Sequence, residues 1–186
     1  TMNINQLESG IRRADAIGGT AMRDAVDAAI DYLRAHATRD RRALLVVTDG
    51  NDNASVTPMA QVRRKVTQAE AVIFAIGVLS DADAPGASKA RHELEDCAEM
   101  TGGRAFFPER LDAINATALD IAHQLRSQYT IAYTPQNQAF DGGYRRIQVA
   151  ARGTERLVVR TRAGYFARPG DAAALPRGAS THLRRR

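Results

Sequence analysis

An apolar run that ends in a carboxylate limits the folds open to this chain. Residues 43–47 read Ala-Leu-Leu-Val-Val, and Thr48-Asp49-Gly50 follow directly. Such a run is typical of a strand buried on both faces, as in parallel sheets covered by helices on either side. Ligands bind beyond the carboxyl ends of the strands in such sheets, so Asp49 is expected where a site would be. The same short polar residues also make ordinary turns that cap a following helix, and both interpretations stay open at this point.

Helical and strand periodicities alternate along the first two thirds of the chain. The spacing of apolar residues predicts helices at about 21–37, 56–69, 88–101 and 111–127, and strands at 43–48, 72–78 and 104–107. This alternation predicts a parallel sheet with right-handed crossovers. After residue 128, alternating apolar and polar residues separated by turn signals predict antiparallel strands near 129–134, 144–151 and 156–163. The expected fold is therefore α/β, a Rossmann-like, mostly parallel sheet flanked by helices, with a C-terminal antiparallel β extension.

A second candidate lies at Gly18-Gly19-Thr20, about one strand–helix unit before Asp49. Two glycines permit a tight turn and a close approach of the backbone. Thr20 stands where the helix at 21–37 begins, and a role as its N-cap would account for it fully. The Thr20 hydroxyl is equally suited to Mg2+, which takes carboxylate, hydroxyl and water oxygens. The sequence therefore offers Thr20 and Asp49 as candidate metal ligands.

These two segments, in this order, resemble two parts of the metal-ion-dependent adhesion site of von Willebrand factor type A (VWA) domains. Gly18-Gly19-Thr20 is similar to the threonine element of that site, and Thr48-Asp49-Gly50 to its aspartate element. Segments 70–78 and 98–107 also resemble the family, and segments 125–135, 144–147 and 162–166 resemble a bacterial subgroup with a small β extension. The resemblance covers roughly residues 4 to 167. It implies a VWA-type fold, a Mg2+ ion completed by an acidic residue of a protein partner, and an extracytoplasmic or secreted setting in a bacterium.

One part of the family's site is missing, because no Asp-x-Ser-x-Ser loop occurs in the sequence. The residues before Gly18 are too few for the family's first strand, first helix and next two strands, so we expect the C-terminal portion of a larger domain. The expected organisation is a partial VWA-like domain at 1–128, an antiparallel β extension packed on it at 129–167, and a basic, disordered tail at 168–186. A Mg2+ site made of Thr20 and Asp49 alone would be partial. The strand at 43–48 would then have an open edge, which favours self-association or pairing with another chain.

Charge, cysteine and histidine content argue against several function classes. From Arg168 on, five arginines and one aspartate contribute +4 of the net charge of +5, so the rest is nearly neutral and no nucleic-acid partner is expected. Cys97 is the only cysteine, and we expect a small buried hydrophobe there in preference to a nucleophile. The four histidines lack zinc-ligand spacing, and no apolar run reaches the length of a membrane span.

The function we expect is non-enzymatic protein binding of the adhesion type, through the partial metal-ion-dependent site. The alternative is a metal-independent interaction module that uses the β extension or the open sheet edge. A third hypothesis, a metal-assisted hydrolase using Asp49 and Asp52, would need a base and a group that stabilises the developing charge. The sequence has no nucleophile elbow, P-loop lysine, His-Glu pair or zinc motif, so we expect no enzymatic activity.

Overall fold

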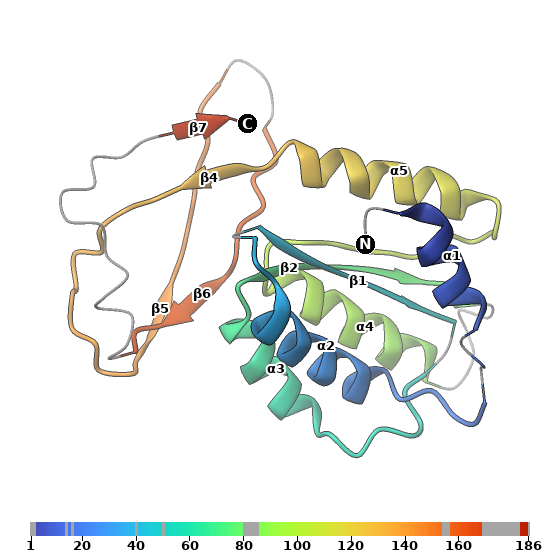
Figure 1. Ribbon diagram of the computed structural model, residues 1–186. Helices are drawn as coiled ribbons and strands as arrows, with labels where there is room; N and C mark the ends of the chain where they lie inside the picture. Colours follow the sequence, from blue (N-terminus) through green and yellow to red (C-terminus); the bar gives the residue numbers. More distant parts are fainter. Residues whose placement is uncertain are drawn as a thin grey trace.

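A parallel sheet forms the centre of the molecule (Figure 1). The computed structural model describes residues 3–13, 15, 17–39, 41–49, 51–79, 86–153, 157–168 and 183–185. Strands β1 (Arg42–Thr48), β2 (Ala71–Gly77) and β3 (Ala105–Phe106) lie in the order β1-β2-β3, all parallel. The pairing of β1 with β2 runs from Arg42 opposite Ala71 to Thr48 opposite Gly77. The predicted α/β class and the parallel arrangement are confirmed.

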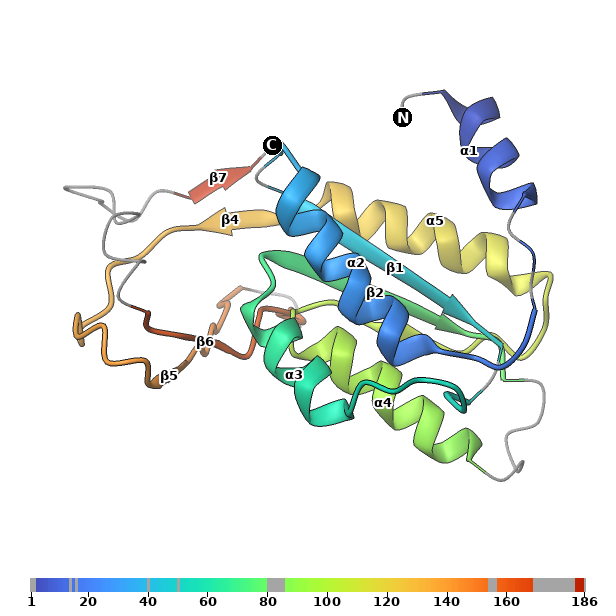
Figure 2. The ribbon, with the colours of Figure 1, turned by 60° about the horizontal axis from the view of Figure 1, so that its bottom comes forward.

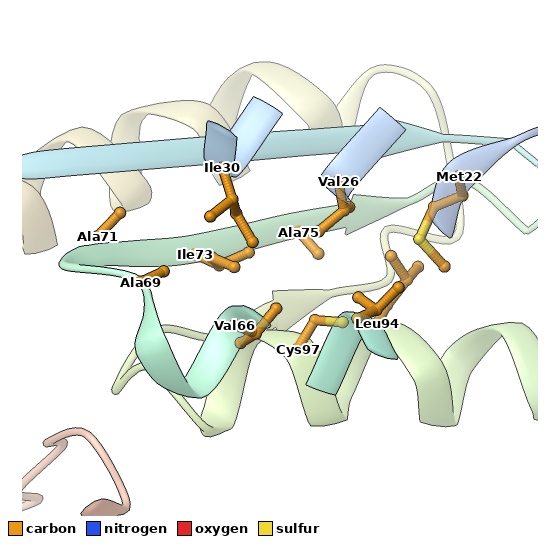
Figure 3. Packing of buried hydrophobic residues seen from close by; sticks show 11 residues of the cluster. Met22, Val26, Ile30, Val66, Ala69, Ala71, Ile73, Ala75, Leu94 and Cys97 are labelled. Atoms are coloured by element: carbon orange, nitrogen blue, oxygen red, sulfur yellow. The ribbon is translucent and has the colours of Figure 1, made fainter. Parts of the chain in front are cut away.

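Helices cover both faces of this sheet (Figure 1). On one face lie α2 (Met22–His36), α3 (Met59–Gln68) and α4 (Ala87–Glu99), and on the other lies α5 (Ala113–Arg126). The main core lies between the sheet and the first three of these helices (Figure 3). Its buried members are Met22, Val26, Ile30, Val62, Val66, Ala69, Ala71, Ile73, Ala75, Leu94 and Cys97. A smaller cluster joins Phe74 and Ile76 of β2 to Ile121 of α5.

The prediction that the strand at 43–48 is buried on both faces is wrong. Strand β2, and not β1, is buried on both faces. Leu44 and Val46 of β1 pack against the main core, while Leu45 is 47% exposed and Val47 is 59% exposed. Leu45 and Val47 are exposed because β1 is an edge strand of the described sheet and α5 packs on Phe74 and Ile76 of β2. A local apolar run does not tell whether a helix covers each face.

Helix α1 (Ile4–Arg12) was not predicted from the sequence. The Asn3 side chain caps it, accepting hydrogen bonds from the amides of Asn5 (3.0 Å) and Gln6 (3.4 Å). Ile4, Leu7 and Ile11 form an apolar stripe at helical spacing, yet the helix buries none of its residues. In Figure 2, α1 stands apart from the sheet.

An antiparallel extension follows α5, as predicted. Strand β5 (Tyr144–Arg146) pairs with β6 (Gly164–Phe166), and β4 (Tyr129–Ile131) pairs with β7 (Leu183–Arg185). The predicted strand at 156–163 is wrong for its described part, since residues 157–163 are irregular and the strand begins at Gly164. The disordered tail expected at 168–186 falls mostly on residues outside the described ranges.

The extension packs against the end of the sheet at which the parallel strands begin (Figure 1). The Arg162 guanidinium donates a hydrogen bond to the carbonyl of Thr67 (3.0 Å). The Ala163 amide donates to the carbonyl of Met100 (3.2 Å). Gly102 has a φ of +83°, and a Cβ there would lie 2.7 Å from the Thr161 backbone. These contacts place the extension at the end of the sheet opposite Asp49.

Candidate functional site

Asp49 follows β1 directly and is exposed at the carboxyl end of the sheet. The Val78 amide, just after β2, donates to the carbonyl of Thr48 at 2.8 Å. The parallel pairing therefore continues to the end of β1 and holds the start of the next loop. This is the edge at which open α/β sheets bind ligands.

The Thr20 loop lies beside the loop that follows Asp49. The Thr20 amide donates to Oδ1 of Asn53 (2.8 Å), and the amides of Asn53 and Ala54 donate back to the Thr20 carbonyl (2.9 and 3.1 Å). A Cβ on Gly19 would collide with Oδ1 of Asn53, so the missing side chain permits this close approach. The structure thus joins the Gly-Gly-Thr segment to a residue only four positions after Asp49. The roles of Thr20 and Asp49 as metal ligands stay a prediction.

Thr20 is not the N-cap of the following helix. Helix α2 begins at Met22, its N-cap position is Ala21, and no side chain at that position caps it. The free amides at the start of the helix are satisfied from another loop: Oδ2 of Asp52 accepts from the Arg23 amide (2.7 Å) and Oγ of Ser55 from the Asp24 amide (3.1 Å). The capping interpretation of Thr20 is therefore wrong, because residues distant in sequence supply the acceptors.

The Asp52 carboxylate is a structural group in this loop. Its side chain is 2% exposed, and besides the Arg23 amide it accepts from the Arg23 guanidinium (3.1 Å), the Ser55 amide (3.1 Å) and the Ser55 hydroxyl (2.6 Å). Burial acts to raise the pKa of Asp52, but the hydrogen bonds from Arg23 and Ser55 outweigh burial and hold that pKa well below its usual value. A buried carboxylate with all these donors is not free to act as a base or a metal ligand. This observation removes one of the two residues on which the hydrolase hypothesis depended.

Asp24 makes the reciprocal contacts from the helix to the loop. Its carboxylate accepts from the amides of Val56 (3.1 Å) and Thr57 (2.8 Å). The hydroxyl of Thr57 and then the two amides lower the pKa of Asp24. We call residues 20–24 and 52–57 together the α2 clamp. Sequence reasoning missed Arg23, Asp24 and Ser55, because their only local signal was that of ordinary turn and helix-start residues.

The donor set for a metal at this edge is small. Among the described residues, no group of three or more His, Cys, Asp and Glu side chains could hold a metal ion. Of the described carboxylates in this region, Asp24 and Asp52 are occupied by backbone and side-chain donors, so the ligands considered are the predicted ones, the Asp49 carboxylate and the Thr20 hydroxyl. Mg2+ takes about six oxygen ligands, so these two would leave most of its coordination to water or to a partner. The residues fit part of such a site.

Cys97 lies in the main core and plays no part at this edge (Figure 3). Its side chain is buried, and burial raises the pKa of its thiol to about 12. The expectation of a small buried hydrophobe is confirmed, since a thiol this far from ionisation is a poor nucleophile.

A cavity lies at the other end of the sheet, where the extension meets the domain. The cavity measures about 270 Å³, and its charged lining residues are Arg41, Arg42, Glu70 and Arg162. Arg42 is paired with Glu70, and Arg162 is bonded to main-chain carbonyls. These arginines therefore hold the extension and the strand ends in place. No helix in the described part of the chain has the length and apolar character needed to cross a bilayer.

Comparison with known proteins agrees with this arrangement. The family model for the von Willebrand factor type A domain matches residues 2–120, which include both the Gly-Gly-Thr and the Thr-Asp-Gly segments. No curated protein sequence and no solved structure matches the chain. The matched segment is more than half of the chain, and its described part has the parallel sheet and flanking helices of an α/β fold. The chain therefore belongs to the von Willebrand factor type A domain family.

Proposed function

We propose that this chain is a non-enzymatic protein-binding module of the adhesion type, with Thr20 and Asp49 as part of a metal-ion-dependent adhesion site. VWA domains are in general protein-interaction modules, and the chain belongs to that family. The observation that supports the finer proposal is the pairing of the Thr20 backbone with Asn53, a residue of the loop that follows Asp49. Asp52, one of the two carboxylates on which the hydrolase hypothesis depended, is committed to the α2 clamp.

In this proposal the Asp49 carboxylate and the Thr20 hydroxyl hold the ion, and the α2 clamp keeps their two loops together. Mg2+, when bound, supplies open positions that favour an anionic oxygen, so the partner is a protein that presents an acidic residue. By resemblance to the bacterial subgroup we also propose an extracytoplasmic or secreted location. Two protein ligands hold Mg2+ weakly, so we expect this chain alone to bind Mg2+ with a dissociation constant of roughly millimolar order or weaker.

The test uses Mn2+ as a paramagnetic substitute, because it accepts the same oxygen ligands as Mg2+. Titrating the 15N-labelled chain with Mn2+ should broaden the amide signals of Thr20 and Asn53 first, and Asp49→Ala should abolish this selectivity. Asp141→Asn is the control, since Asp141 is an exposed carboxylate in the extension that should not affect the pattern. Broadening centred elsewhere, or unchanged in Asp49→Ala, would contradict the proposal. Micromolar affinity for Mg2+ would contradict a two-ligand site.

A second candidate is a metal-independent interaction module, and a specific observation favours it. Edge strand β1 leaves Leu45 and Val47 half exposed, and the extension exposes Tyr129, Ile131 and Tyr133. Binding that survives EDTA would favour this function over the metal-dependent one. Either candidate is compatible with the coarse function of a VWA domain.

A further inference from the structure

The cavity between the extension and the sheet combines apolar side chains with arginines, and the proposed function does not use it. Arg42 and Ala71, the first residues of β1 and β2, both line it, so it lies at the end of the sheet where the parallel strands begin (Figure 1). Its volume of about 270 Å³ has room for an organic molecule of about nine non-hydrogen atoms, since a water takes about 30 Å³. The apolar part of the lining is Val66, Ala69, Ala71, Val72 and Met100.

The Arg42 guanidinium in this cavity is held by long hydrogen bonds. It donates to the carbonyls of Arg39 (3.3 Å) and Ala37 (3.5 Å) and to the carboxylate of Glu70 (3.4 Å). All three distances exceed the usual range of about 2.7–3.2 Å. The Glu70 side chain is 75% exposed, so water can replace Arg42 as its partner at little cost. The structure therefore has a carboxylate at this guanidinium that another carboxylate can replace.

Arg162 brings a second guanidinium to the cavity from the extension. It donates to the carbonyls of Gly164 (3.1 Å) and Thr67 (3.0 Å). A guanidinium carries five N–H donors, so these two bonds to described residues leave further donors for a ligand. Arg41 also lines the cavity, and no described residue forms an ion pair with it.

The lining has a net positive charge. Its charged side chains are three arginines and one glutamate, a balance of +2: Arg41, Arg42, Arg162 and Glu70. Helices α3 and α4 end at Gln68 and Glu99, and the residues that follow, Ala69 and Met100, line the cavity. Each helix C-terminus contributes about half a negative charge, which lowers the balance to about +1. One singly charged anion neutralises a cavity of this kind.

We propose that this cavity binds a small organic monocarboxylate, whose carboxylate replaces that of Glu70 at the Arg42 guanidinium. The planar fork of a guanidinium matches a carboxylate with two parallel hydrogen bonds. The apolar body of the acid lies against the apolar part of the lining, in the manner of small-molecule pockets in which a few polar groups fix the orientation. Inorganic phosphate can bond to the arginines but has no apolar part, so it leaves that lining in contact with water.

Benzoate is the probe, because it has the charge and roughly the size that the cavity requires. Titrating the 15N-labelled chain with sodium benzoate in EDTA, at constant ionic strength, should shift the amide signals of Ala71, Val72 and Thr130, with a dissociation constant of roughly millimolar order. The amide signals of Thr20 and Asn53 should stay in place, which separates this site from the metal-dependent one. Benzamide, the uncharged analogue, and inorganic phosphate should each bind about tenfold more weakly or worse.

Two substitutions should change the affinity in opposite directions. Glu70→Gln should tighten benzoate binding about two- to fivefold, because it removes the competing carboxylate. Glu109→Gln is the matched control, since it makes the same change of charge at an exposed residue after β3, at the other end of the sheet, and should have no effect. Arg42→Gln should weaken binding about tenfold or more, with the melting temperature as the check that the chain is folded.

Four results would overturn the proposal. They are benzamide or phosphate binding as tight as that of benzoate, shifts centred away from the cavity, an affinity that Glu70→Gln leaves unchanged or lowers, and equal tightening by Glu109→Gln. The Glu70→Gln result does not depend on the folding of the Arg42 variant, because Glu70 is exposed and its one ion pair is long.

Discussion

Replacing Asp52 by asparagine should destabilise the fold, because its buried carboxylate holds the α2 clamp together. Asparagine keeps the shape but replaces one oxygen by an NH2 group, and each of the two oxygens accepts from both Arg23 and Ser55. At least one buried donor then loses its acceptor, and the Arg23 guanidinium loses its charged partner at 3.1 Å. An unsatisfied buried group costs about 1–3 kcal/mol, and breaking a buried ion pair costs about 3–5 kcal/mol.

Arg23 is 19% exposed and keeps some hydration, so the lower end of the ion-pair range applies. We therefore expect the free energy of unfolding to fall by about 3 kcal/mol, with a drop in melting temperature of roughly 6–12 °C for a chain of this size. Urea unfolding followed by circular dichroism measures the change. Asp141→Asn is a matched control, because Asp141 also pairs with an arginine (Arg145, 2.8 Å) but at the surface, and its replacement should leave the free energy of unfolding nearly unchanged.

The difference in stability between wild type and Asp52→Asn should depend on pH. The pKa of Asp52 is held well below its unfolded value of about 3.9, so its ionisation contributes stability that is complete above about pH 5 and is lost as the pH falls toward the folded pKa. Asparagine does not titrate, so the difference in stability between wild type and Asp52→Asn should shrink as the pH is lowered from 5 to 2. A loss below 1 kcal/mol at pH 7, or a difference that is the same at pH 7 and pH 3, would refute the structural role of Asp52.

Three further predictions concern the core. Cys97 should react with a thiol reagent at pH 8 only after denaturation, because burial raises the pKa of its thiol to about 12; rapid reaction in native buffer would contradict this. Thr101→Val should cost about 2 kcal/mol in urea unfolding, since Oγ1 of Thr101 accepts from the buried Ile73 amide at 2.8 Å, and a neutral result would show that the amide finds another acceptor. Gly103→Ala should cost about 3 kcal/mol or more, because its Cβ would collide with the Ile73 carbonyl oxygen, whereas Gly10→Ala meets no atom within 4 Å and should be neutral or slightly stabilising.

Local periodicity predicted the order and type of most elements. The strand expected at 72–78 is β2 (Ala71–Gly77), and the helix expected at 88–101 is α4 (Ala87–Glu99). Such segments carry their signal in their own residues, because the spacing of apolar side chains matches the period of the element. The prediction at 156–163 failed because three consecutive apolar residues satisfied a strand pattern, while the pairing partner of β5 is the later segment Gly164–Phe166.

The candidate site was only partly readable from sequence. The Gly-Gly-Thr and Thr-Asp-Gly segments were recognisable, and the structure brings the Thr20 backbone into contact with Asn53. The sequence selected Asp49 through its place after the strand and in the Thr-Asp-Gly segment, but it did not show that Asp52 is buried and fully hydrogen-bonded. The structure leaves Asp49 exposed and surrounds Asp52 with donors from Arg23 and Ser55. Asp52 is buried because the start of α2 lies against its part of the loop, and the local sequence does not show which helix lies there.

The amino-acid sequence by itself determined the alternation of strands and helices, the apolar character of β1 and the family to which the chain belongs. Only the tertiary structure decided that β1 is an edge strand of the described sheet with Leu45 and Val47 exposed, and that Asp52 instead of Thr20 caps α2. The physical reason is that burial, hydration and hydrogen-bond saturation depend on neighbours that are distant in sequence. The same apolar strand is a core strand when helices cover both of its faces, and it leaves alternate side chains exposed when a helix layer covers only one.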